Sequence, residues 1–69
     1  MEIASLREAM HQQPFKSFTI RTVDGRSFEI RHPDFLAVHP RRVEYTHHET
    51  GVRTVLEPLL IVAIDFPKA

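Results

Sequence analysis

The segment FTIRTVDGRSFEI, residues 18–30, decides the fold that we expect for this chain. Apolar residues recur at every second position on both sides of the central Asp24-Gly25 pair. Such alternation is typical of half-buried strands, and an Asp-Gly pair between two of them is a strong hairpin signal. The segment therefore predicts two antiparallel strands joined by a tight connection.

The register of this hairpin follows from which residues must share a face. A two-residue turn at Asp24-Gly25 would place the apolar Ile20 opposite the charged Glu29. A three-residue loop, residues 23–25, places Ile20 opposite Phe28 instead. Because a slip of one residue turns every side chain to the other face of the sheet, we predict the three-residue loop, with Gly25 in the left-handed conformation.

A helix is expected before the hairpin. Pro14 ends it, because the residue before a proline is disfavoured in the α conformation. A capping-box pattern at Ser5-Leu6-Arg7-Glu8 is compatible with a start as late as Leu6. Apolar residues at helical spacing favour an earlier start, so the predicted helix covers about residues 2–12. These apolar residues are Ile3, Leu6 and Met10.

Several segments of strand character follow the hairpin. Gly51 marks a four-residue loop, residues 48–51, that places Tyr45 opposite Thr54 and so joins two of them. Proline-containing corners at residues 32–34 and 57–58 interrupt the pattern. The segments are residues 35–39, 43–47, 52–56 and about 61–66.

These elements predict an α+β, mostly β fold. The chain is expected to form a single domain, residues 1–69, with its sheet at about residues 16–66. We expect a five-stranded, strongly bent antiparallel meander that closes into a small barrel, with the helix over one open end. Closure would remove the exposed strand edges. The alternative is a flat sheet with the helix across one face.

The composition restricts the kinds of partner and compartment. Nine Lys and Arg balance nine Asp and Glu, whereas proteins that bind nucleic acid usually carry a net basic surface. The chain has no cysteine, which excludes disulfides and thiolate zinc sites. The acidic N-terminus lacks the features of a signal peptide. The longest apolar run has six residues, far short of the roughly 20 that span a bilayer. We therefore expect a cytoplasmic protein that does not insert in membranes.

Histidines raise the question of a metal site. The His47-His48 pair is followed by Glu49, but neighbouring residues on a strand point to opposite faces and would not share an ion. We expect exposed polar histidines at turns and no metal, with a His-dependent metal protein as an alternative. The five histidines are His11, His32, His39, His47 and His48.

Catalytic residues are scarce in the sequence. Ser17 and Ser27 are expected on the strand surface, without the adjacent base that a nucleophile needs. Asp34 is expected to form a turn rather than to act as an acid or base. The sequence therefore predicts a protein that is not an enzyme and that holds no cofactor.

Arg41 and Arg42 form the one concentrated basic spot in the sequence. With Tyr45 as a stacking ring, they are the candidate patch for nucleic acid or another partner. Arg21 and Arg31 share their predicted hairpin face with Glu29, and such a mixture of charges is typical of the solvated face of a sheet.

The apolar run from residue 59 to residue 64 predicts a subunit interface. A half-exposed strand would alternate, and this run does not, so both of its faces are expected to be covered. A chain of this size has one core, so the second face is expected to meet another copy. Ile61 and Ala63 are the positions expected to face outward. The predicted interface comprises Leu59, Leu60, Ile61, Val62, Ala63 and Ile64.

Nearly the whole chain resembles a family of short bacterial proteins to which no function is assigned. The matching stretches are LREAMHQQPFKSFTI, DGR, HPDFLAVHP and the terminal LLIVAIDF. The resemblance supports a bacterial origin and implies nothing about activity.

A more distant resemblance, in the order of elements, is to Sm-like proteins such as bacterial Hfq. The Asp24-Gly25-Arg26 turn and the apolar Leu36 and Val38 loosely match the first Sm motif. The resemblance implies a bent five-stranded barrel of the Sm-like (SH3-like) type, rings formed through the last two strands, and RNA binding. Glu57-Pro58 stands where these proteins carry Arg-Gly or Lys-His, so the RNA-binding residues do not carry over.

The sequence thus predicts a non-enzymatic, self-associating small barrel that serves as an interaction module. It is expected to be a homo-oligomer with a possible protein partner. An RNA-binding Sm-like ring is the alternative from another functional class.

Overall fold

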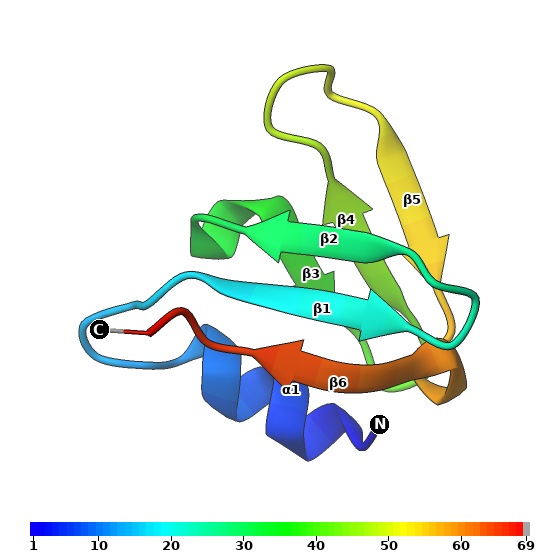
Figure 1. The fold of residues 1–69 in the computed structure, drawn as a ribbon, viewed down its shortest axis with the longest axis horizontal. Coiled ribbons are helices and arrows are strands. Elements are labelled where there is room, and N and C mark those ends of the chain that lie inside the picture. The colour runs from blue at the N-terminus through cyan, green and yellow to red at the C-terminus, as the bar shows by residue number, and fades with distance from the viewer. Residues whose placement is uncertain (69) are drawn as a thin grey trace.

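The structure is a computed structural model that describes residues 1–68, and it contains one N-terminal helix and six strands (Figure 1). The strands form two three-stranded antiparallel sheets, with the orders β2-β1-β6 and β3-β4-β5. The predicted α+β, mostly β class is therefore confirmed. The elements are α1 (Ile3–Met10), β1 (Phe18–Thr22), β2 (Ser27–Ile30), the 3-10 turn η1 (Pro33–Phe35), β3 (Leu36–Val38), β4 (Val43–Thr46), β5 (Arg53–Leu56), the 3-10 turn η2 (Pro58–Leu60) and β6 (Ile61–Asp65).

The first hairpin has the predicted register. Ile20 lies opposite Phe28, and Gly25 has a φ of 86°, in the left-handed region. The Thr22 hydroxyl, which is buried, donates a hydrogen bond to the Asp24 carboxylate and thereby closes the turn from inside. This hydrogen bond is the main reason that the pKa of Asp24 lies below its ordinary value. The turn is thus held by its own side chains as well as by its glycine.

The second hairpin also has the predicted register. Tyr45 lies opposite Thr54, and Val43 lies opposite Leu56. Gly51 has a φ of 74° and ends the loop between β4 and β5. Both hairpins could be predicted because a glycine turn and an alternating pattern fix their register locally.

The helix α1 starts early, as the apolar spacing indicates, and is shorter than predicted. Glu2 is its N-terminal cap without a side-chain hydrogen bond, so the capping box at Ser5 does not form and Ser5 lies within the helix. Leu6 and Ala9 are its buried residues, and the helix packs against β3. No helix within residues 1–68 has the length and apolar character needed to cross a bilayer.

The predicted closed, five-stranded barrel is wrong. Within residues 1–68, the strand ladders join β2, β1 and β6, or β3, β4 and β5, but do not join one sheet to the other. The η1 turn interrupts the chain between β2 and β3, and η2 interrupts it between β5 and β6. Each turn begins with a proline, Pro33 or Pro58, which has no N–H to donate to a ladder. Six short strands therefore form, and each sheet keeps two open edges.

The core lies between the two sheets and α1. The inward residues of both hairpins meet Leu6 and Ala9 of the helix there, and Ile61 is the residue that β6 contributes to the fully buried set. The buried apolar residues are Leu6, Ala9, Phe18, Ile20, Ile30, Leu36, Val43, Tyr45, Leu56 and Ile61. A single continuous core thus holds both sheets together although no ladder links them.

Replacing Gly25 with valine is expected to lower the free energy of unfolding by about 1–2 kcal/mol, because a β-branched residue is strained in the left-handed region. A Cβ added at Gly25 meets no atom within 4 Å, so the loss arises from the backbone and not from a clash. Urea denaturation measures the change. Gly25→Asn is the matched control, since asparagine tolerates this conformation better. Equal losses in the two variants would contradict the assignment.

Candidate functional site

The predicted basic spot lies in the turn between β3 and β4. The turn is closed by the backbone N–H of His39, which donates to the carbonyl oxygen of Arg42 at 2.9 Å. Arg41 is exposed and has no ion pair within residues 1–68, whereas Arg42 Nε lies 3.7 Å from a carboxylate oxygen of Glu44. An open hollow of about 600 Å³ is lined by His39, Pro40, Arg41 and Arg42. We call it the turn hollow.

Tyr45 does not share this surface. Its residue is only 4% exposed, and its ring packs against Phe28 of the other sheet with 5.1 Å between centroids. Burial raises the pKa of Tyr45 above its ordinary value. A ring enclosed between the two sheets is not available to stack on a nucleobase, so the predicted patch loses its aromatic component.

A charge cluster around Glu44, which the sequence reasoning missed, adjoins the basic turn. The Glu44 carboxylate lies 2.7 Å from His39 Nε2 and 3.5 Å from Arg53 Nε, and Arg42 approaches the same group. The hydrogen bond to His39 is the largest cause of the lowered pKa of Glu44. The predicted register could have indicated this cluster. It places Arg53 opposite Thr46, and Thr46 lies on the same face of β4 as Glu44.

The histidine pair is arranged differently from the prediction. The rings of His47 and His48 stack in parallel, with centroids 5.0 Å apart, because β4 ends at Thr46 and alternation no longer applies to the pair. His47 Nδ1 accepts hydrogen bonds from the backbone N–H groups of Glu49 and Thr50, so this atom stabilises the loop between β4 and β5. Within the part of the chain that the structure describes, no group of three or more His, Asp or Glu side chains is placed to hold a metal ion.

Strand β6, which contains most of the apolar run, has a bulge where it pairs with β1. Arg21 pairs with Ala63 and Thr22 pairs with Ile61, so Val62 has no partner on β1. The bulge changes the phase of the strand, which explains why the run does not alternate. Ile61, expected to face outward, is 1% exposed and belongs to the core. Ala63 is half-buried.

Two residues of the run are strongly exposed, and a third residue joins them from the first hairpin. Leu59 is 87% exposed and Val62 is 57% exposed. Val23, which is 65% exposed, donates its backbone N–H to the carbonyl oxygen of Leu60 at 2.8 Å, so its backbone lies beside the end of η2. We call Val23, Leu59 and Val62 the apolar patch. Leu60 and Ile64 are half-buried.

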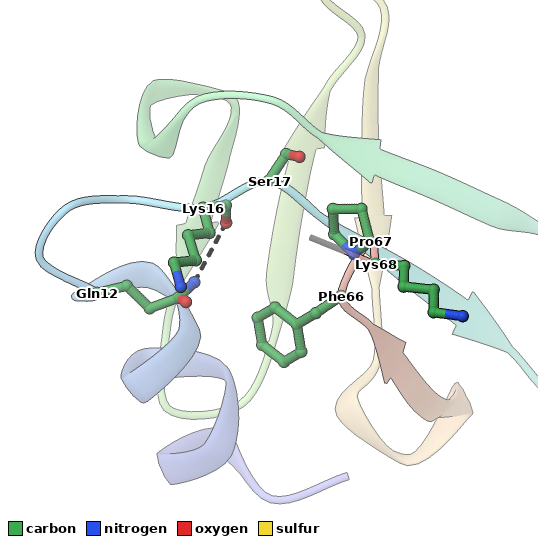
Figure 2. Close-up of a pocket in the computed structure, with 6 residues that line it drawn as sticks. All are labelled: Gln12, Lys16, Ser17, Phe66, Pro67 and Lys68. Atoms are coloured by element: carbon green, nitrogen blue, oxygen red, sulfur yellow. Dashed lines mark hydrogen bonds between the residues drawn. The ribbon is translucent and has the colours of Figure 1, made fainter.

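A second hollow lies between the loop after α1 and the C-terminal tail (Figure 2). It has a volume of about 510 Å³ and is lined by Gln12, Lys16, Ser17, Phe66, Pro67 and Lys68. The Gln12 amide group donates hydrogen bonds to the carbonyl oxygens of Ala9 and Lys16, so it fastens the loop to the helix. The Gln12 amide nitrogen is thus already engaged in hydrogen bonds that stabilise the fold.

No family model matches the chain, and the searches of curated proteins and of solved structures give no match either. The function must therefore be argued from the geometry of these surfaces.

Glu44→Gln is expected to destabilise the protein near neutral pH and to lose this effect in acid. The pKa of Glu44 in the folded protein lies below its ordinary value of 4.5, so folding favours the ionised form. That stabilisation is fully present above the pKa of the unfolded chain and disappears as the pH falls through the folded value. Urea denaturation of both proteins between pH 7 and about 2.5 measures the difference.

Glu8→Gln is the control for this series, because Glu8 is exposed on α1 and makes no ion pair within residues 1–68. Its effect should not vary in the same way with pH. A Glu44→Gln deficit that stays constant down to acid pH would show that the carboxylate charge does not matter.

We expect no specific RNA binding. The arginines near the β3–β4 turn lack an exposed aromatic ring, since Tyr45 is buried. Fluorescence anisotropy with oligo-U and oligo-A at about 0.1 M salt should give dissociation constants no tighter than about 10⁻⁴–10⁻⁶ M, the non-specific range. Sub-micromolar binding that is lost in the Arg41→Ala/Arg42→Ala variant would contradict this expectation.

Proposed function

We propose that this domain is a non-enzymatic interaction module that binds further copies of itself through the apolar patch. The observation that supports the proposal is the exposure of Leu59 and Val62, at 87% and 57%, together with that of Val23, at 65%. Apolar side chains that cluster on the surface of a small protein favour contact with another chain.

The free edge of β6 adds a second reason. The backbone N–H of Thr22 donates to the carbonyl oxygen of Arg26, so the backbone groups of Thr22 and Ile20 point toward β2. The backbone groups of Arg21, between them, point toward β6, where Ile20 lies opposite Ile64. The N–H and C=O groups of Ile64 therefore point to the outer edge of β6. The amino group of Met1 occupies part of this side, since it donates to the carbonyl oxygens of Pro58 and Ile61 at 2.7 and 3.0 Å. Unpaired groups of an edge strand favour association with another chain.

The size of the protein is a third reason. A core built from 69 residues rarely supplies more than about 3–5 kcal/mol, and a chain without cysteine cannot add disulfides. Association between copies is one of the remaining ways to stabilise such a domain.

Light scattering on the purified full chain tests the proposal. We expect an oligomer at high micromolar concentration that dissociates on dilution, because the exposed patch is small. A monodisperse monomer of 8.0 kDa at this concentration would refute it.

Leu59→Lys and Val62→Lys are expected to give folded monomers, because a lysine at a subunit contact would be buried without a partner. Circular dichroism should show that both variants keep the fold. Ile61→Lys, by contrast, is expected to unfold the protein, because Ile61 is in the core.

Val52→Lys is the matched control, since Val52 is 60% exposed and lies before β5, at the end of that strand away from Leu59. It should leave the oligomeric state unchanged. Oligomers that persist in both patch variants would show that the apolar patch is not the contact.

A further inference from the structure

The most exposed large apolar side chain within residues 1–68 lies at the end of the sheet that also carries the turn hollow. Leu59, in η2, is 87% exposed. The turn hollow has a proline ring and two arginines among its four lining residues. Arginine stems are aliphatic and can cover an apolar side chain while their guanidinium groups stay in water. The hollow therefore suits a leucine whose neighbours carry negative charge.

The register of the second sheet brings these two features together. Val43 lies opposite Leu56. Arg42 precedes the first of these residues and Glu57 follows the second, so the turn hollow and η2 lie at the same end of the sheet. In Figure 1 the β3–β4 connection and the segment between β5 and β6 lie at this end, and the β4–β5 loop lies at the opposite end. The segment that carries Leu59 and the turn hollow thus lie at the same end of the sheet.

The charges on this surface complement one another between copies. Arg41 and Glu57 are both exposed, and neither makes an ion pair within residues 1–68. Arg42 and Arg53 share the single carboxylate of Glu44, so the turn carries an excess of positive charge. A glutamate two residues before the projecting leucine matches that excess.

We propose that the self-association inferred above is a two-fold dimer in which Leu59 of each copy enters the turn hollow of the other. Glu57 of each copy then pairs with Arg41 of the partner subunit. A two-fold axis between the leucine and the hollow allows both contacts to form twice, and the assembly closes on itself. This inference rests on the proposed function and names the surface that carries it.

Charge reversal in the full chain tests the pairing by sedimentation equilibrium. Glu57→Arg and Arg41→Glu should each weaken the dimer about tenfold, because each dimer contains two such pairs and either substitution makes both of them repulsive. The double variant Glu57→Arg/Arg41→Glu should restore the wild-type dissociation constant. An equimolar mixture of the two single variants should also associate as strongly as wild type, since both pairs are then attractive.

Glu49→Arg is the matched control, because Glu49 is exposed in the β4–β5 loop at the other end of the sheet. It changes the net charge as Glu57→Arg does and should leave the dimer unchanged. Circular dichroism of every variant checks that the fold is kept.

The outcomes separate this inference from the function on which it rests. A wild-type monomer overturns both. A wild-type dimer that Leu59→Lys dissociates, but that the charge variants leave intact, overturns the pairing and supports self-association. A trimer or larger ring overturns the two-fold arrangement. Weakening in both single variants without rescue by the double variant or the mixture also overturns the pairing.

Discussion

The position of β1 in the middle of the first sheet is the constraint on which the rest of the structure depends. β1 pairs with β2 on one edge and with β6 on the other, so its register sets the register of both neighbours. Phe18, Ile20 and Thr22 on its inner face are all buried. A slip of one residue would expose this set and place charged residues between the sheets.

The two proline turns decide how this sheet relates to the second one. Because η1 and η2 interrupt the chain, the sheets pack through side chains and not through a shared ladder. The cost of this arrangement is a set of open strand edges. The amino group of Met1 covers part of one of them. The apolar patch adjoins the same region, which is why we assign the interaction surface to this end of the molecule.

The two faces of β4 differ in chemistry because one faces the core between the sheets and the other faces solvent. The inner face of β4 carries Tyr45 into the core, and its outer face carries Glu44 among basic groups. The arginines near the β3–β4 turn therefore lie beside a carboxylate and without an aromatic ring. Such a surface lacks the exposed aromatic rings on which single-stranded nucleic acids stack.

The amino-acid sequence by itself determined the fold class, both hairpin registers and the early start of α1. These features are local, because alternation, helical spacing and glycine turns act over a few residues. Only the tertiary structure decided that the sheets stay separate, that Tyr45 is enclosed against Phe28 and that Ile61 faces the core. The bulge at Val62 arises where β6 meets β1, some 40 residues earlier in the chain. No local pattern encodes a pairing between segments so far apart. This pairing decides which residues of β6 face the core and therefore which residues form the apolar patch.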